Sequence, residues 1–343
     1  MKSFSRRTFM QSSAAAALAA SPILSAFAKT GLFAAEPAEA SKLIWGVLLH
    51  LGHNMWGDCP TAYTPPVDHF TFEENLWDEL TDKASKLGLN MVVIDLGEGV
   101  QYKSHPEIAI KGAWSVDKLR EELKRLREMG LEPIPKLNFS SCHDFWLGDY
   151  AKMVSTPTYY KVCSELVQEV VEIFDGPRFF HLGYDEEAYR HQTTLEYIVI
   201  RQGELWKKDF LFFVEQCEKN GTRPWIWADY AWDHKDFLEW APKSVVMSNW
   251  YYEDDFDPKS NPVVQCYLDI DAAGYDQIPA GSDIWDHNEN FAKTVKFGKE
   301  KLSKERTLGY LQVPWRFTES KYHELNNRSL DQIGEAIKNY NKD

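Results

Sequence analysis

Short, continuous apolar runs alternate with longer amphipathic runs along the chain after residue 42. The short runs are typical of strands that a parallel sheet buries on both faces, and the longer runs have the apolar spacing of helices. The pattern predicts eight strands, over residues 43–51, 90–96, 131–139, 178–182, 223–228, 244–250, 262–268 and 308–313. It predicts helices over residues 72–87, 116–129, 158–174, 202–220, 234–240, 288–302 and 330–340.

The regular alternation of these runs indicates the fold class. Neither a change in composition nor a linker rich in Pro and Gly interrupts it. Eight strands that alternate with helices predict an α/β fold with a single (β/α)8 TIM barrel. A doubly wound open sheet is the alternative, and the count of eight strands disfavours it.

The first 28 residues have the pattern of an export signal. Arg6 and Arg7 form a twin-arginine element, an Ala-rich apolar run covers residues 14–24, and residues 26–28 suit cleavage by signal peptidase. The apolar run is shorter than the ~20 residues that span a bilayer, which disfavours a membrane anchor. We therefore expect a twin-arginine signal peptide over residues 1–28 that is removed on export.

Removal of this segment would leave a flexible leader over residues 29–41 and a barrel domain over residues 42–343. The predicted location is the periplasm or the outside of the cell. The whole chain has a formal net charge of −14. Because phosphate binding depends on clustered Lys and Arg, this charge argues against nucleic acid or an anionic membrane as partner. No later segment is long and apolar enough to span a membrane, and the sequence does not indicate an oligomeric state.

Aromatic residues make up 14% of the chain, and 13 residues are Trp. Ring faces stack on the C–H surfaces of sugars while carboxylates bind hydroxyl groups, so this composition in an exported protein suggests a carbohydrate partner, although large cores also use Trp. The five cysteines include no Cys-x-x-Cys pair, and no His-Glu-x-x-His motif or Gly-rich phosphate loop is present. We therefore expect neither a metal site nor a cofactor.

Polar and aromatic residues follow the predicted strands, and a barrel brings such positions to one rim. The clearest case is an apolar run from residue 178 that ends in Asp185, Glu186 and Glu187. Each position alone has a simple explanation as a solvated loop residue, but their repetition predicts one cleft. The candidates are His50, His53, Asp95, Glu98, Asn138, His143, His181, Asp185, Glu186, Trp227, Asp229, Asn249, Trp250, Tyr267, Asp269, Trp315 and Glu319.

Residues 181–186 read His-Leu-Gly-Tyr-Asp-Glu and resemble the His-x-Gly-Gly-Asp-Glu signature of glycoside hydrolase family 20, the β-N-acetylhexosaminidases. Residues 225–229 resemble the Trp-x-Asp element of the fifth strand, and residues 267–269 resemble the Tyr-Leu-Asp of the seventh. Trp315 resembles the Trp at the end of the eighth strand, with Glu319 as the acid that follows. The resemblance covers residues 43–319 and implies a barrel hydrolase for β-linked N-acetylhexosamine.

The resemblance also implies roles for single residues. Glu186 corresponds to the general acid/base, Asp185 to the residue that orients the 2-acetamido group, and Tyr267 to the phenol that binds its carbonyl oxygen. That carbonyl attacks the anomeric carbon, so the implied mechanism is substrate-assisted, retaining and exo-acting. Because Asp185 and Glu187 are like charges in a cleft, we expect a raised pKa for Glu186, and we expect Glu187 to face solvent or to cap the next segment. The expected sugar contacts are Tyr267, Asp269, Trp227, Asp229, Trp250, Trp315, Glu319, His143 and His181.

The chain also departs from the family pattern, and other functions stay open. Tyr184 replaces the second Gly of the signature, and no Arg follows the first strand. One alternative is a conventional retaining glycosidase with Asp269 as nucleophile. Others are a non-catalytic carbohydrate-binding barrel and an exported oxidoreductase, although a Gly-x-Gly-x-x-Gly element is missing. Packing in the core competes with sugar contact for each Trp, including Trp285, and also for His143 and His181.

Overall fold

The computed structural model describes residues 42–59, 65–187, 189–284, 289–340 and 342. The residues from Leu43 to Asp343 form one compact unit. The predicted signal peptide and leader lie outside the described residues, as does Trp285. No described helix combines the length and the apolar character that a membrane span requires.

Eight parallel strands form the barrel, in the order β8-β7-β6-β5-β2-β1-β10-β9. Parallel bridges from Met247 to Gln277 and from Trp250 to Ala280 join the two ends of this sheet. The prediction of a single (β/α)8 barrel is therefore confirmed. The strands are β1 (Ile44–His50), β2 (Met91–Asp95), β5 (Glu132–Lys136), β6 (Phe179–His181), β7 (Arg223–Trp227), β8 (Val246–Ser248), β9 (Ala280–Gly281) and β10 (Gly309–Gln312).

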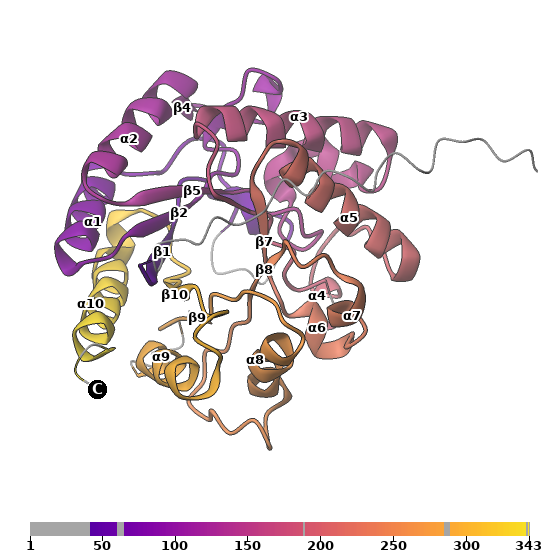
Figure 1. Cartoon of the computed structure of the whole chain (residues 1–343). Coiled ribbons are helices and arrows are strands. Elements are labelled where there is room, and N and C mark those ends of the chain that lie inside the picture. Colours follow the sequence, from indigo (N-terminus) through magenta and orange to yellow (C-terminus); the bar gives the residue numbers. More distant parts are fainter. Residues whose placement is uncertain (1–41, 60–64, 188, 285–288, 341, 343) are drawn as a thin grey trace, which may run out of the picture. The chain divides into compact units, whose positions relative to one another are not determined.

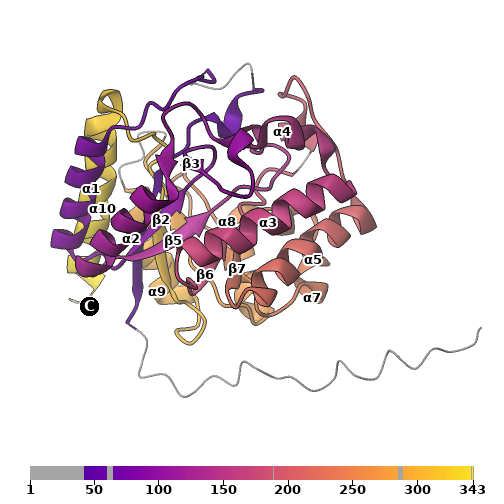
Figure 2. The ribbon, with the colours of Figure 1, turned by 90° about the horizontal axis from the view of Figure 1, so that it is seen from above.

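Seven longer helices surround the strands, with α1 beside α10 and α3 beside α5 (Figure 1, Figure 2). The first begins after Glu73, buries an apolar face and ends at Gly88, whose φ of 92° suits glycine. The helix after β4 begins at Ser115, whose side chain accepts a hydrogen bond from the Lys118 amide. These helices are α1 (Glu74–Leu87), α2 (Val116–Glu128), α3 (Pro157–Ile173), α5 (Gly203–Lys219), α8 (Pro262–Ala272), α9 (Asn290–Lys301) and α10 (His323–Tyr340).

Short elements occupy the connections between strands and helices. A two-stranded sheet, β3 with β4, follows β2, and the long connection after β5 contains the 3-10 helix η3. These pieces follow the carboxyl ends of barrel strands. They are β3 (Val100–Gln101), β4 (Trp114–Ser115), α4 (Tyr189–Gln192), α6 (Tyr230–Asp233), α7 (Phe237–Trp240), η1 (Asn54–Trp56), η2 (Pro106–Ile108), η3 (Phe145–Met153) and η4 (Ser320–Tyr322).

The strand predicted over residues 262–268 is wrong, because this segment begins helix α8. The Asn261 side chain accepts hydrogen bonds from the amides of Val263 and Val264, and Pro262 occupies the first turn. A capping Asn followed by Pro favours the start of a helix. The seventh strand is instead the two-residue β9, so Tyr267 and Asp269 are not at a strand end.

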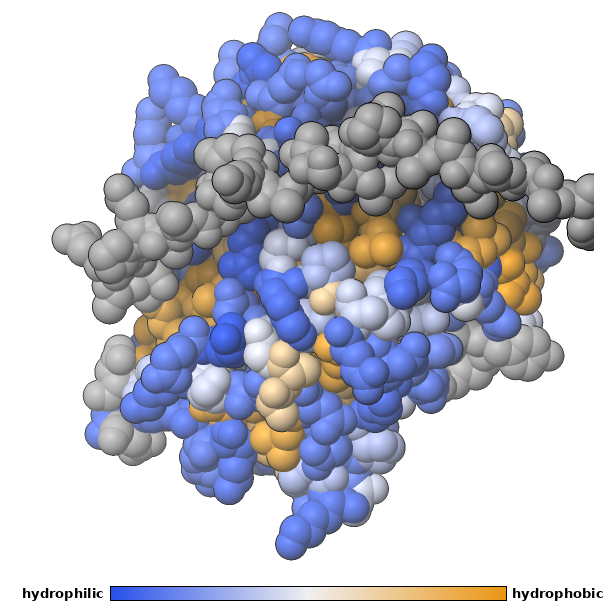
Figure 3. Space-filling view, turned by 45° about the vertical axis from the view of Figure 1, so that its right-hand side comes forward, coloured by the Kyte–Doolittle hydropathy of each residue, from blue (hydrophilic) through white to orange (hydrophobic). Residues whose placement is uncertain are grey.

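A polar layer lies inside the barrel below its carboxyl-terminal rim. His50, Asp95, Lys136 and His181 are register partners on four adjacent strands. Lys136 is fully buried, and its Nζ lies 2.5 Å from Asp95 Oδ2. This layer places a buried positive charge beneath the acids that follow β6. On the face drawn in Figure 3 the described surface is largely hydrophilic, with smaller hydrophobic areas between.

Candidate active site

The chain after β6 adopts left-handed backbone conformations where it carries two carboxylates to the end of the barrel. Gly183 has a φ of 73°, and a Cβ there would overlap the side-chain amide of Asn138. In the same segment Tyr184 and Glu186 have φ values of 71° and 61°, and Trp315, which follows β10, has a φ of 51°. Such conformations cost a non-glycine residue roughly 1–3 kcal/mol each and gather at functional sites. Glu186 is itself one of the carboxylates, which makes this end of the barrel the candidate functional site.

A cavity of about 230 Å³ opens at this end of the barrel. Its polar groups come from the connections after β5 and β6, and its aromatic walls come from those after β1, β8 and β10. Carboxyl ends of parallel strands are where barrel enzymes carry their chemistry. The described lining residues are Trp56, His143, Asp185, Glu186, Trp250, Tyr252, Ile284 and Trp315.

One histidine joins the two carboxylates in this cavity. His143 Nε2 lies 3.2 Å from Asp185 Oδ2 and 3.1 Å from Glu186 Oε2. Burial alone would lower the pKa of His143, but the two acids outweigh it and raise that pKa to about 10. Burial likewise opposes ionisation of Asp185, yet His143, Lys136 and the Asn138 amide hold the pKa of that carboxyl below its ordinary value. Near neutral pH the cavity therefore holds an imidazolium between two carboxylates.

The expectation of a raised pKa for Glu186 is wrong. Burial acts in that direction, but hydrogen bonding and charge from His143, together with the charge of His191, lower the pKa of Glu186. His191 Nε2 lies 3.5 Å from Glu186 Oε1. The acids next to Glu186 in sequence favour a raised pKa, but His143, from the connection after β5, outweighs them.

Asp229 is the acid whose pKa is raised, to about 8, by burial and then by the charges of Asp185 and Glu186. Its Oδ2 accepts a 2.7 Å hydrogen bond from the Glu186 amide, and its Oδ1 accepts a 3.3 Å bond from Trp250 Nε1. Asp229 does not line the described cavity. It holds the backbone of Glu186 and the Trp250 ring in place from behind.

Asp229→Asn is expected to reduce the pH dependence of stability between pH 4 and pH 8. Because its pKa is raised on folding, Asp229 binds more protons in the folded chain than in the unfolded chain over this interval, so its contribution to the free energy of unfolding falls as pH rises. The Asn variant lacks the titrating group, so its free energy should fall less. Urea unfolding at several pH values measures this, with the exposed Asp236→Asn as control. Parallel curves for Asp229→Asn and wild type would contradict the raised pKa.

Glu187 is buried, so the expectation that it faces solvent is wrong. Its Oε1 accepts hydrogen bonds from Arg201 Nη2, at 2.8 Å, and from the Ser141 amide, at 2.8 Å. Arg201 also reaches Asp209 Oδ2 at 3.1 Å and the Phe139 carbonyl at 2.8 Å. The three charged side chains are fully excluded from solvent. Arg201 therefore ties the residue after Glu186 to α5 and to the connection after β5.

Four predicted sugar contacts lie away from the cavity. Tyr267 of α8 is buried against Phe297 of α9, and Asp269 pairs with Lys235 Nζ at 2.6 Å. Both residues lie on helix α8, where the sequence predicts the end of a strand. Asp269 therefore does not lie in the cavity as a nucleophile beside Glu186. Trp227 and His181 are fully buried with ring centroids 4.5 Å apart.

Glu319 is also outside the described lining of the cavity. It accepts a hydrogen bond from the Thr71 hydroxyl, lies 3.0 Å from His53 Nδ1, and pairs with Lys321 Nζ at 2.6 Å. The candidates His50, His53, Asp95, Glu98, Asn138 and Asn249 are buried and belong to the supporting structure rather than to the described lining.

The structure adds three lining residues that sequence reasoning missed. Trp56 lies shortly after β1, and Tyr252 lies two positions after Trp250. Because both are close in sequence to a strand end, their position could have indicated that they line the cavity. Tyr252 accepts a 3.0 Å hydrogen bond from Trp315 Nε1 and stacks on Trp250 with centroids 5.1 Å apart. No pattern in the sequence indicates that Ile284 lines the cavity. Tyr184, by contrast, turns its ring into the core against Trp206.

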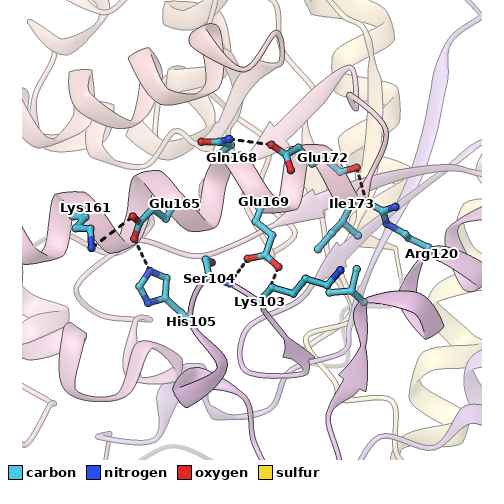
Figure 4. Close-up of a pocket in the computed structure, with 11 residues that line it drawn as sticks. Lys103, Ser104, His105, Arg120, Lys161, Glu165, Gln168, Glu169, Glu172 and Ile173 are labelled. Atoms are coloured by element: carbon cyan, nitrogen blue, oxygen red, sulfur yellow. Dashed lines mark hydrogen bonds and ion pairs between the residues drawn. The ribbon is translucent and has the colours of Figure 1, made fainter.

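A larger cavity of about 500 Å³ lies on the outside of the barrel, between α2 and α3 (Figure 4). Its acids already have partners within the chain. Glu169 accepts hydrogen bonds from the amides of Lys103 and Ser104, and Glu165 lies 3.0 Å from His105 Nε2. Because these acids serve to hold the connection after β3 against α3, this groove is the weaker candidate for catalysis.

Metal chemistry finds no support among the residues that the structure describes, which contain no cluster of three or more His, Cys, Asp or Glu with metal-binding geometry. Cys142, Cys163, Cys217 and Cys266 are buried thiols, and burial raises the pKa of each.

No family model and no curated protein sequence matches this chain. Several solved structures match it. A β-N-acetylhexosaminidase from Bacteroides fragilis NCTC 9343 has a TM-score of 0.57 at 12% identity, over 84% of this chain and 65% of that one. A GH20 exo-β-N-acetylglucosaminidase from Vibrio harveyi has a TM-score of 0.61 at 13% identity, over 86% and 54%. Dispersin B has a TM-score of 0.56 at 14% identity, over 86% and 99%.

The chain spans less than two thirds of the length of the first two of these proteins. At such identities the likeness concerns the backbone of the barrel and leaves substrate and activity open. The chain therefore has a GH20-like (β/α)8 fold.

Proposed function

We propose that the protein is an exported glycoside hydrolase that removes terminal β-linked N-acetylhexosamine by substrate-assisted, retaining catalysis. The observation that carries this proposal is the convergence of Asp185, Glu186 and Tyr252 in one aromatic-walled cavity at the carboxyl end of the barrel. The GH20-like fold supports it, and the sequence pattern of residues 1–28 supports export. The small cavity, about 230 Å³, suits one terminal unit better than an extended chain.

The cavity offers complementary groups for an acetamido substituent. Asp185 can accept the amide N–H through a carboxylate that already accepts a 2.8 Å hydrogen bond from Asn138 Nδ2. The Tyr252 hydroxyl accepts its bond from Trp315 Nε1, which leaves its own hydrogen for the amide carbonyl. Tyr252 thus takes the role first assigned to Tyr267. Held between these two groups, the carbonyl oxygen attacks the anomeric carbon and replaces an enzyme nucleophile.

Proton delivery in this proposal uses His143 and Glu186 together. Glu186 has a lowered pKa and His143 a raised one, so the proton of the pair resides on His143 Nε2 before substrate binds. As negative charge develops on the departing oxygen, His143 passes its proton to Glu186 across the 3.1 Å contact, and Glu186 donates a proton to that oxygen. In the second step the ionised Glu186 accepts a proton from the attacking water and the pair regains its starting state.

Hydrolysis is expected to require the 2-acetamido group. Nitrophenyl N-acetyl-β-glucosaminide or galactosaminide should be cleaved, whereas the plain glucoside and galactoside should not, because removal of the amide removes the nucleophile. Steady-state kinetics with these four substrates measures this. A thiazoline mimic of the cyclised intermediate should inhibit tightly. Comparable turnover of a plain glycoside without thiazoline inhibition would contradict the mechanism.

One observation favours a second candidate, a barrel that binds carbohydrate without cleaving it. His143 holds Glu186 in its ionised form, which disfavours proton donation. Binding of N-acetylglucosamine without turnover of any aryl glycoside would support this candidate. A pH–rate profile that shows turnover when the His143–Glu186 pair is protonated, and loss of turnover when the pair loses its proton, would contradict this candidate.

A further inference from the structure

A second cavity, of about 330 Å³, lies beside the candidate active site. The connection after β5 separates the two: Ser141 and Asp144 line the second cavity, whereas His143 between them lines the first. The opposite wall includes Asp58 and Glu196, and the Glu196 amide donates a 2.9 Å hydrogen bond to the Asp58 carbonyl. The two cavities therefore share a wall that is one segment thick.

Acids outnumber cations in the described lining of this second cavity. Asp58, Asp144, Asp149 and Glu196 face a single cation, Lys152. Burial, reinforced by the charges of Asp58 and Glu187, raises the pKa of Asp144 well above its ordinary value despite Arg201. Burial also raises the pKa of Asp58. Burial is the main cause of both shifts.

Two buried polar atoms at this cavity have no hydrogen-bond partner among the described residues, Asp144 Oδ2 and Ser141 Oγ. Each side chain belongs to a residue that is only 4% exposed. Asp144 precedes η3 at the capping position, yet its side chain makes no capping hydrogen bond. Leaving a buried acceptor without a partner is unfavourable, and more so when the acceptor is charged. This arrangement is that of a site whose ligand supplies the missing donors.

We propose that this cavity binds a small organic cation with a primary ammonium group. An ammonium carries the charge that the lining lacks and donates three hydrogen bonds, which Asp144 Oδ2 and Ser141 Oγ can accept. A bare metal ion fits less well, because the described acids do not form a metal-binding cluster. The volume lies within the roughly 300–1,000 Å³ of small-molecule sites. The site is independent of the hydrolase proposed above.

Titration calorimetry on the full chain at pH 6.5 tests this site with glucosamine, glucose and 1,4-diaminobutane. At least one amine should bind, with glucose at least tenfold weaker. Asp144→Asn should weaken amine binding at least tenfold. Glu305→Gln is the matched control, because it removes an exposed acid just before β10, at the opposite end of the barrel. Trp315→Ala should also leave amine binding unchanged, since it alters only the first cavity.

The outcomes separate the parts of the proposal. Binding of both amines would show that the ammonium suffices, glucosamine alone would indicate an amino sugar, and diaminobutane alone a non-sugar amine. Glucose binding as tight as glucosamine binding, or no binding of either amine, would overturn the proposal. Unchanged affinity in Asp144→Asn would overturn the location. If thermal unfolding shows that Asp144→Asn does not fold, Ser141→Ala takes its place with an expected loss of at least threefold. None of these readouts requires hydrolysis, so failure here leaves the proposed function untouched.

Discussion

Glu186→Gln is expected to lower kcat for an aryl N-acetyl-β-glucosaminide by about 10²–10⁴-fold, the range that a positioned general acid contributes. The amide keeps the shape of the side chain but cannot deliver a proton to the departing oxygen. Binding should persist, because the walls formed by Trp250, Tyr252 and Trp315 are unchanged. Steady-state kinetics and calorimetry with N-acetylglucosamine measure the two effects separately.

The dependence on the leaving group distinguishes an acid from a structural residue. A dinitrophenyl leaving group needs little proton assistance, so Glu186→Gln should lose less activity on it than on a methylumbelliferyl substrate. Equal losses on both would show that Glu186 is not the acid. Glu165→Gln provides the matched control, because Glu165 pairs with His105 on the outside of the barrel, and its kcat should equal that of wild type.

Arg201→Met is expected to destabilise the fold by about 3–5 kcal/mol, the usual cost of removing one partner from a buried ion pair. The change leaves Glu187 and Asp209 inside the protein without their cation and removes the hydrogen bond to the Phe139 carbonyl. Because Glu187 directly follows Glu186, kcat should fall as well. Urea unfolding measures the first effect and steady-state kinetics the second.

Two further variants identify the cause of that loss. Arg178→Met removes an Arg whose pair with Glu132 is partly exposed, with side chains 45% and 35% accessible, and should cost less than about 1 kcal/mol. Neutralising both acids in the background of Arg201→Met, with Glu187→Gln and Asp209→Asn, should recover part of the stability. No recovery would mean that packing, and not the buried charge, dominates.

The fold was predictable where a segment carries its own signal. Helix α1 has a continuous apolar face and ends at Gly88, and helix α2 begins with the capping residue Ser115. Strand β1 is buried at all seven positions, as its continuous apolar run predicts. The prediction of the seventh strand was wrong because β9 has only two residues, too few to show a periodicity. The apolar residues at the start of α8 have the pattern of a buried strand.

The sequence by itself determined the barrel class and seven of its eight strands, and it placed Asp185 and Glu186 in the connection after β6. Both follow from local patterns, since burial along a strand and the residues after it are read from neighbours in the chain. Only the tertiary structure decided that His143 bridges the two acids, that Tyr252 and not Tyr267 faces them, and that Arg201 neutralises Glu187. These contacts join different strands, and the pKa of each acid follows the charges packed around it in space rather than those beside it in sequence.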